Sequence, residues 1–402
     1  MTSGSTWHQA PSSDMNSGIH PRAGQDILYI SSENTDAQQV AQSWTNIEGF
    51  FGECTITGTS EHVSEPNLKS KLFSSALGPS TLKPYYYKAR HPVHQKDITL
   101  STLVTRNRFP VLGRLASHYK GPISAAIHIN DDATKDQVMK ELDGLFDTNP
   151  DVRQYVDVHL IIDPFDRQFN LWRNVAKLYA RTDYIMMLDV DFYLCTDFRH
   201  RVLSNPSVLA KLDAGRTALV VPAFEYLLQD DGLDASTFPT HKTDLIQQVQ
   251  QDRIDMFHKS WLNGHGATNY SHWYTSSDLY KVTDYNFSYE PYVIFKKDGA
   301  PWCDERFIGY GANKAACLYE IYLAGLEYWV LPDDFLIHQT HSYPEDTRRK
   351  ERQYNRKLYS NFREELCLRY SRKYMATGEW DTARSDNLKT ECQKIRGYRS
   401  AV

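Results

Sequence analysis

The most constraining feature of this sequence is a short apolar run, Tyr184–Leu188, that ends in Asp189-Val190-Asp191. The run is too short to cross a membrane and has the length of a strand buried on both faces of a sheet. In open α/β sheets, functional residues collect just beyond the carboxyl ends of such strands. Two carboxylates two residues apart can hold one divalent cation there, and that cation can neutralise a diphosphate. The pattern therefore predicts a nucleotide-sugar site, against the alternative of an exposed turn with two solvated aspartates.

Strands and helices alternate regularly from Asp97 onward. The pattern predicts strands at Ile98–Thr105, Ile123–Ile129, Val156–Ile162, Tyr184–Leu188 and Thr217–Phe224. It predicts helices at Arg108–Tyr119, Ala133–Phe146 and Asn170–Ala180. Strands that alternate with helices of this length are typical of βαβ units. We therefore expect an α/β fold with a mostly parallel central sheet flanked by helices.

The second half of the chain is mixed in character. The predicted elements are a polar helical segment around Lys242–His258, strands at Tyr289–Lys296 and Tyr328–His338, a helix at Asn313–Ala324, and a charged helix at Asp346–Lys373. Arg348–Arg352 can be interpreted as a basic patch, but a solvated helix face is the favoured interpretation.

The ends of the chain differ from its centre. Residues 1–26 are rich in Ser, Gly and Pro and predict a disordered tail, and residues 27–96 predict an irregular region. Residues 97–345 then form one large catalytic domain, and residues 346–402 a helical extension. No segment approaches the roughly 20 apolar residues of a membrane span, and residues 1–26 lack the pattern of a signal peptide. We expect either a soluble protein or a chain whose membrane anchor has been removed.

Composition narrows the class of partner. The 402 residues carry a net charge of −5, which argues against nucleic acid because phosphate binding needs a basic surface. The six cysteines include no C-x-x-C pair and no zinc-like spacing. Six cysteines neither require nor exclude disulfides, so the compartment and the pairing stay open.

Three further segments carry candidate site residues. His338 ends an apolar strand and is the best third metal ligand, and Mn²⁺ accepts imidazole more readily than Mg²⁺ does. Arg173 and Asn174, early in a helix, can face a diphosphate or a sugar carboxylate. Asp304 and Glu305 suit a base that takes the proton of an acceptor hydroxyl. The alternatives are a capped strand end, a helix-surface arginine and a structural turn with a solvated acidic pair.

Taken together, these segments resemble the glycosyltransferases of the LARGE type (family 49), which include the β-1,4-glucuronyltransferase of dystroglycan glycosylation. The resemblance runs from about Thr102 to Tyr370. The segments that carry it, in the family's order, are Gly121–Ser124, Asn170–Ala176, Leu188–Phe192, Val221–Glu225, Gly264–Trp273, Glu290–Val293, Asp304–Lys314 and Val330–His338.

The resemblance implies a GT-A type nucleotide-sugar-binding fold, a manganese ion (or magnesium), a UDP-sugar donor, a glycan or glycoprotein acceptor and inversion to a β linkage. It implies that Asp189, Asp191 and His338 bind the metal and that Asp304, preferred over Glu305, is the base. Arg173, Asn174, Asp189 and Lys314 are then expected at the donor, and His265, Trp273, Gly309, Gly311 and Asn313 at the substrate. The lumen of the Golgi and secretory pathway is the implied location, with the cytoplasm as the alternative.

This chain also departs from the family pattern, at Gln229–Pro239 and at Ala312, where relatives often have a larger residue. Both positions are expected near the acceptor, so glucuronic acid, xylose, N-acetylglucosamine and galactose all stay possible as donor sugars. For glucuronic acid, Arg173 or Lys314 can pair with the sugar carboxylate. Two other classes of protein compete with a transferase. These are a catalytically inactive carbohydrate-binding or scaffold protein of the same fold, and a metal-dependent hydrolase or nucleotidyltransferase.

Overall fold

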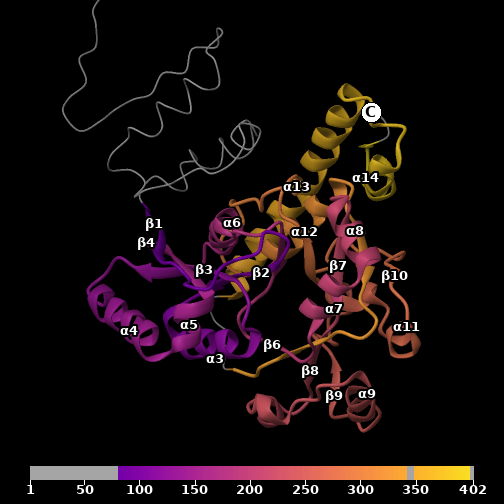
Figure 1. Ribbon diagram of the computed structural model, residues 1–402. Coiled ribbons are helices and arrows are strands. Elements are labelled where there is room, and N and C mark those ends of the chain that lie inside the picture. Colours follow the sequence, from indigo (N-terminus) through magenta and orange to yellow (C-terminus); the bar gives the residue numbers. More distant parts are fainter. Residues whose placement is uncertain (1–79, 342–347, 399–402) are drawn as a thin grey trace, which may run out of the picture. The chain divides into compact units, whose positions relative to one another are not determined.

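The computed structural model describes residues 80–341 and 348–398 (Figure 1). The expectations for residues 1–26 and for 27–79 lie outside these ranges. The strands are β1 Thr81–Tyr87, β2 Ile98–Val104, β3 Ile123–Asn130, β4 Val156–Asp163, β5 Tyr184–Met187, β6 Phe192–Leu194, β7 Thr217–Val221, β8 Ala223–Tyr226, β9 Ile254–Met256, β10 Tyr280–Lys281, β11 Tyr292–Lys296, β12 Glu327–Val330 and β13 Leu336–His338. The helices are α3 Phe109–Tyr119, α4 Lys135–Thr148, α5 Pro150–Tyr155, α6 Phe169–Tyr179, α7 Phe198–Ser204, α8 Pro206–Asp213, α9 Lys242–Gln250, α10 Leu262–His265, α11 Tyr270–Thr275, α12 Asn313–Leu323, α13 Arg348–Ala376 and α14 Asp386–Cys392.

A nine-stranded sheet runs through the molecule in the order β1-β4-β3-β2-β5-β11-β7-β12-β10. The strands β4, β3, β2 and β5 are parallel neighbours, as the alternating pattern predicts. The α/β class is confirmed, and the strands and helices predicted up to residue 188 are present with ends within two residues. The sheet as a whole is mixed, because β11 inserts antiparallel between β5 and β7. A local sequence pattern predicts a strand but not the strands with which it pairs. The insertion of β11 between β5 and β7 was therefore not predicted.

Two segments that were predicted as single strands are each divided between two sheets. Thr217–Phe224 is interrupted at Pro222 into β7 and β8, and Tyr328–His338 is interrupted around Pro332 into β12 and β13. Proline has no backbone N–H to donate to a sheet. In each segment the first strand belongs to the large sheet and the second to a four-stranded sheet of order β6-β13-β8-β9. The two segments run parallel to each other through both sheets.

Helices cover both faces of the parallel strands. Side chains of α3, α4 and α5 share one apolar core with β2, β3 and β4. On the other face, α6 packs Leu171, Trp172 and Val175 against Ala126 and Ile161. The helices α12 and α13 belong to a third core with the strands β7 and β11.

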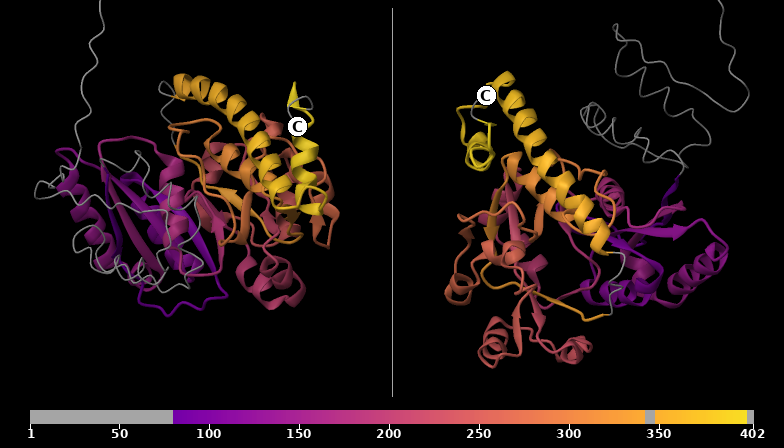
Figure 2. Two further views of the ribbon diagram at one scale, coloured as in Figure 1. Left: turned by 90° about the horizontal axis from the view of Figure 1, so that it is seen from above. Right: turned by 180° about the vertical axis from the view of Figure 1, so that it is seen from behind.

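The long helix α13 crosses the second half of the fold, and Figure 2 shows it from above and from behind. Its buried residues Tyr359, Phe362 and Leu366 share the core of α12, and the Cys367–Cys392 disulfide ties it to α14. The strand β1, from the region expected to be irregular, pairs with β4 at the edge of the large sheet. None of the helices within the described ranges is long and apolar enough to span a bilayer.

Candidate active site

Asp189 and Asp191 lie on the short connection between the two sheets. The connection leaves β5 of the large sheet and enters β6 of the small sheet at Phe192. His338 pairs with Phe192 across β13 and β6, and the Gln339 N–H donates to the Asp191 carbonyl at 2.8 Å. The three side chains predicted as metal ligands therefore come from neighbouring strand ends, although about 150 residues separate His338 from the two aspartates along the sequence.

The carboxylate of Asp189 faces two cations and a phenol. Lys314 Nζ and Arg173 Nη2 each lie 3.3 Å from it, and the Tyr292 hydroxyl donates to Oδ2 at 2.9 Å. Burial opposes ionisation of Asp189, but Lys314, Arg173 and the Tyr292 hydroxyl outweigh it and hold the pKa of this carboxyl far below its usual range. Asp189 is therefore an anion at neutral pH.

The carboxylate of Asp191 also contacts basic side chains of the protein. Arg108 Nε lies 2.6 Å from Oδ1, and His341 Nε2 lies 3.2 Å from Oδ2. Arg108 had not been predicted as a site residue. Its only signal in the sequence is its place just beyond the strand Ile98–Val104, where parallel strands of one sheet end together.

His338 supplies a neutral imidazole. Burial lowers the pKa of His338 to about 4, although the nearby Asp191 opposes the shift. The neutral ring is the form that binds a metal. Two carboxylates and an imidazole suit Mn²⁺ as donors. In residues 80–341 and 348–398, however, no three acidic, histidine or cysteine side chains stand close enough to hold a metal together.

Lys314 and Tyr292 contact each other beside Asp189. The Lys314 ammonium lies 3.2 Å from the centre of the Tyr292 ring. Burial lowers the pKa of Lys314, and Asp189 and Glu290 oppose that change. Burial raises the pKa of the Glu290 carboxyl, and Lys314 and Arg173 oppose the rise. Tyr292 and Glu290 were not predicted individually, because nothing in the sequence connects them to Asp189.

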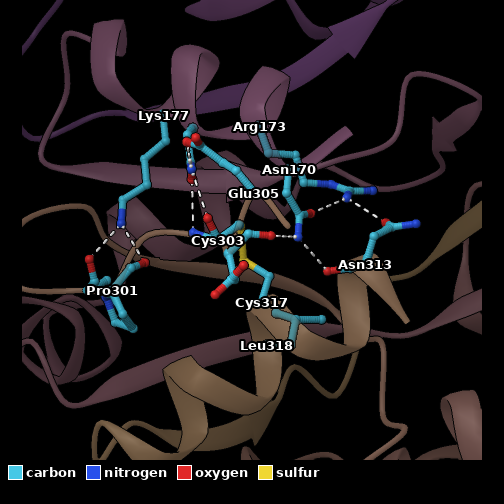
Figure 3. The surroundings of a disulfide bond; sticks show 12 residues. Asn170, Arg173, Lys177, Pro301, Cys303, Glu305, Asn313, Cys317 and Leu318 are labelled. Atoms are coloured by element: carbon cyan, nitrogen blue, oxygen red, sulfur yellow. Dashed lines mark hydrogen bonds between the residues drawn. A yellow bond between two sulfur atoms is a disulfide. The ribbon is translucent and has the colours of Figure 1, made fainter. Parts of the chain in front are cut away.

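The polar face of α6 holds the loop that precedes α12 (Figure 3). Asn174 Nδ2 donates to the Cys303 carbonyl at 2.9 Å and to Glu305 Oε1 at 2.6 Å, and Asn174 Oδ1 accepts the Cys303 N–H at 2.9 Å. Asn170 donates to the carbonyls of Asp304 and Asn313. Lys177 donates to two further carbonyls at the start of the loop.

The hydrogen bonds of α6 explain why nine of its eleven residues are buried. Asn174 was expected to contact the donor, and the structure places its amide against the loop instead. The Cys303–Cys317 disulfide fastens the same loop to α12. Together these bonds fix the place at which Lys314 leaves the loop.

Asp304 and Glu305, the predicted acidic pair, are both bonded to the protein. The Asp304 carboxylate accepts hydrogen bonds from two nitrogens of the Arg306 guanidinium, at 2.8 and 3.0 Å, and from the Arg306 backbone N–H at 2.9 Å. Arg306 also pairs with Glu365 of α13 at 2.8 Å. The Asp304 carboxylate is therefore held by a guanidinium that also contacts α13.

Gly309 and Gly311 allow α13 to approach the loop closely. Both have positive φ, at 79° and 89°, and a Cβ at either position would collide with Glu351 or Arg352. The missing Cβ at each glycine therefore makes room for α13, and the role of these glycines at the substrate stays a prediction. Asn313 caps the arrangement, since its Oδ1 accepts from Arg173 Nη1 at 2.7 Å and its Nδ2 donates to the Gly309 carbonyl at 2.9 Å.

The two predicted residues of the 264–273 segment have different surroundings. His265 is buried near the site, with its ring 6.3 Å from that of Tyr292. Burial, with Lys314 nearby, lowers the pKa of His265 well below its usual value. Trp273 is fully buried, and its indole N–H donates to the Leu331 carbonyl at 2.9 Å. Trp273 is thus a core residue that offers no ring face to a sugar, contrary to the prediction.

Comparison with known proteins identifies the family of this chain. The family model described as glycosyl-transferase for dystroglycan matches residues 97–168 and 164–371. The xylosyl- and glucuronyltransferase LARGE1 of Danio rerio is 31% identical over 297 residues, which cover 72% of this chain and 37% of that protein. LARGE1 of Mus musculus is 29% identical over 71% of this chain and 37% of its own. LARGE2s of Danio rerio is 32% identical over 61% of this chain and 32% of that protein.

A solved structure of GalNAc-T7 with UDP, GalNAc and Mn²⁺ aligns with a TM-score of 0.42 and 8% identity over 76% of this chain and 57% of that chain. No residue role is taken from so distant a likeness. The chain spans only about a third of the length of the curated relatives. Because the family model covers well over half of the residues, the chain belongs to the family of glycosyl-transferases for dystroglycan.

Proposed function

We propose that this protein is a metal-dependent inverting glycosyltransferase that moves a sugar from a UDP-sugar to a glycan acceptor. One observation carries the proposal: Asp189, Asp191 and His338 gather beside two buried cations, Lys314 and Arg173, in a chain of this family. The relatives named above are xylosyl- and glucuronyltransferases, so xylose and glucuronic acid are the first donor sugars to test.

Asp189, Asp191 and His338 would hold the metal, Mn²⁺ in preference to Mg²⁺. A divalent cation at that place supplies positive charge to the diphosphate of the donor as the sugar leaves. Positively charged side chains of the protein would provide the rest of the electrostatic stabilisation of the diphosphate. Lys314 and Arg173 lie in a poorly solvated site, where a fixed cation acts more strongly on an anion than it does in water.

The transfer would be a single displacement. The acceptor hydroxyl oxygen bonds to the anomeric carbon, the bond from that carbon to the diphosphate oxygen breaks, and UDP leaves with the electron pair. The hydroxyl proton passes to a carboxylate, and attack opposite to the leaving group inverts the anomeric centre.

Two carboxylates compete for the role of base. Asp304 is the choice from the family resemblance, and its carboxylate is bonded to the Arg306 guanidinium. Glu290 lies near Lys314 and has a raised pKa, which suits a group that must take up a proton. Asp304→Asn and Glu290→Gln separate them, since the variant that lacks the base loses transfer but retains metal-dependent UDP binding.

The secretory pathway is the location we propose for this chemistry. The described residues contain two disulfides, Cys303–Cys317 and Cys367–Cys392. Disulfides form and persist in oxidising compartments.

An inactive carbohydrate-binding protein is the second candidate. The observation that favours it is that Arg108, Arg173 and Lys314 already neutralise the two aspartates. A screen of UDP-sugars with Mn²⁺, with and without β-glycoside acceptors, separates the two candidates. UDP release from one donor that requires both metal and acceptor supports the transferase. Silence across the panel together with no UDP binding favours the inactive protein.

A further inference from the structure

Trp261 is an exposed tryptophan that the site described above does not use. Of the six tryptophans at residues 80–341 and 348–398, it alone is exposed, with 55% of its surface accessible. Trp172 and Trp273 are buried, and the other three are half-buried. Trp261 therefore presents to solvent the kind of ring that was predicted for the substrate at Trp273.

The indole of Trp261 rests against a glycine. A Cβ at Gly264 would lie 2.9 Å from a ring carbon of Trp261, closer than such atoms approach other groups. Gly264 does not have positive φ, so its place calls for the space and not for the conformational freedom of glycine. The Trp261 N–H donates to the His258 carbonyl at 2.7 Å, and the Gly264 N–H donates to the Trp261 carbonyl at 2.9 Å. Trp261 is thus fixed on a turn of residues 258–264, which we call the tryptophan turn.

The end of the tryptophan turn is bonded to the candidate active site. The Gly264 carbonyl accepts the N–H of Glu290, one of the two candidate bases, at 2.7 Å. The indole and the Glu290 backbone therefore contact the same residue. His265, the next residue, has its ring 6.3 Å from that of Tyr292, whose hydroxyl donates to Asp189. The turn lies at the edge of the site, next to Glu290.

The start of the tryptophan turn packs on the same site. The His258 ring stacks on Phe257 at 3.8 Å between ring centres, and the Phe257 ring lies 5.0 Å from that of His338. His258 has a φ of 56°, in the backbone region that favours glycine, and it is exposed. The chain therefore has an imidazole where glycine would suit the backbone better. The turn presents an exposed imidazole and an exposed indole three residues apart.

We propose that the tryptophan turn is a subsite for the acceptor glycan, in which the Trp261 indole stacks on the apolar C–H face of a pyranose ring. Both surfaces are stabilised by leaving water, and polar groups beside an aromatic ring can bond the hydroxyls of the sugar. His258 and Asn263 are exposed polar groups on this turn. The place next to Glu290 suits an acceptor, because the attacking hydroxyl must reach a carboxylate. The subsite rests on the proposed function only for the identity of its ligand as an acceptor.

Calorimetric titration tests the subsite without donor or metal. The saccharide probes are xylotetraose, cellotetraose and β-1,4-galactotetraose. Xylitol, a polyol without a ring, and vesicles of phosphatidylcholine are the contrasting probes.

Three variants of one residue separate the ring face from folding. Trp261→Ala removes the side chain, Trp261→Leu keeps apolar bulk against Gly264 without an aromatic plane, and Trp261→Phe keeps a plane. Met375→Ala, which removes an exposed apolar side chain near the end of α13, is the control.

We expect the native protein to bind at least one of the three oligosaccharides about tenfold or more tightly than xylitol. Trp261→Ala and Trp261→Leu should each weaken that binding by about tenfold, whereas Trp261→Phe and Met375→Ala should stay within about threefold of the native affinity. The bound saccharide should also protect Trp261 from acrylamide quenching of its fluorescence.

Four results would each overturn the proposal. They are no binding of any of the three oligosaccharides, equal affinity for xylitol, native affinity in both Trp261→Ala and Trp261→Leu, and Trp261-dependent binding to the vesicles alone.

A transfer assay keeps the two proposals apart. If oligosaccharides bind through Trp261 but no UDP-sugar is consumed, the subsite stands and the transferase fails. If transfer occurs and Trp261→Ala keeps the native KM for the acceptor, the transferase stands and the subsite fails. With both correct, Trp261→Ala raises the KM for the acceptor and leaves the KM for the donor unchanged.

Discussion

At the scale of the residue, the candidate site is organised by the charge of Asp189. Lys314 and Arg173 are buried, and a buried cation is costly unless an anion accompanies it. Asp189 supplies that anion to both and also accepts the Tyr292 hydroxyl. The residue predicted as a metal ligand therefore also stabilises the metal-free protein, and its two roles can be separated by measurement.

Asp189→Asn should abolish sugar transfer and lower the free energy of unfolding by about 1–2 kcal/mol, a modest loss because the side chain is 34% exposed. Urea unfolding and UDP release measure the two effects. Asp278→Asn, at an exposed position, is the control and should change neither. Full turnover of Asp189→Asn in the presence of Mn²⁺ would contradict the metal site.

At the scale of the element, α6 determines where the loop before α12 lies. Its apolar face packs on the sheet, as its sequence pattern predicts, and its polar face binds backbone groups of a loop more than 120 residues away in the sequence. The prediction that Asn174 faces the donor was reasonable from its place in the chain. Only the packing of the loop on α6 reveals Asn174 as a positioning residue.

Asn174→Ala should destabilise the protein by about 2–3 kcal/mol, because the N–H and the carbonyl of Cys303 and the Glu305 carboxylate each lose a partner. We expect the KM for the donor to rise more than kcat falls, since the loop leads to Lys314. The exposed Gln251→Ala is the control. An unchanged unfolding midpoint in Asn174→Ala would show that the loop is held by other contacts.

The strand β4 carries a histidine that makes stability depend on pH. His159 Nδ1 accepts the Tyr85 N–H at 3.0 Å, and burial, followed by Arg181, lowers the pKa of His159 to about 3. The unfolded chain binds this proton near pH 6.5, so stability is complete above that pH and falls as the pH is lowered toward 3.

From pH 7 to pH 5, His159 should contribute a loss of about 2 kcal/mol in the free energy of unfolding. Urea titrations at the two pH values measure it, and in His159→Gln the difference between them should shrink by that amount. Other buried histidines contribute equally to both proteins, so the comparison isolates His159. Equal pH dependence in the two proteins would mean that His159 has the same pKa in the folded state as in the unfolded chain.

At the scale of the whole molecule, two disulfides in the described part of the chain join elements that are close in the sequence. Cys303–Cys317 closes the loop beside the candidate site, and Cys367–Cys392 ties α13 to α14 away from it. Both close short chain segments, with sequence separations of 14 and 25, so each should stabilise the fold to a similar degree.

Replacing either pair with serine should lower the free energy of unfolding by about 3 kcal/mol in the chain-entropy account. We expect only the Cys303→Ser/Cys317→Ser protein to lose transfer activity well below its melting temperature, because only that pair fixes the approach to Lys314. Thermal unfolding and initial rates measure both proteins. Equal loss of activity in the two variants would mean that general stability, and not the local loop, limits the rate.

The sequence alone was sufficient for the α/β class and for β2 to β5 with α3, α4 and α6, because periodicity is a local signal. It did not predict β1 or α5. Asp189, Asp191 and His338 as joint metal ligands stay a prediction that rests on strand ends and on the family resemblance. Pro222 and Pro332, at which the two predicted strands divide, could be read from the sequence. The second sheet that the chain enters after each proline could not. Only tertiary packing places Tyr292, Glu290 and Arg108 at the site. It also places Trp273 in the core and not at the site. The order of strands decides which side chains face one another, and strand order depends on long-range pairings that no local pattern records.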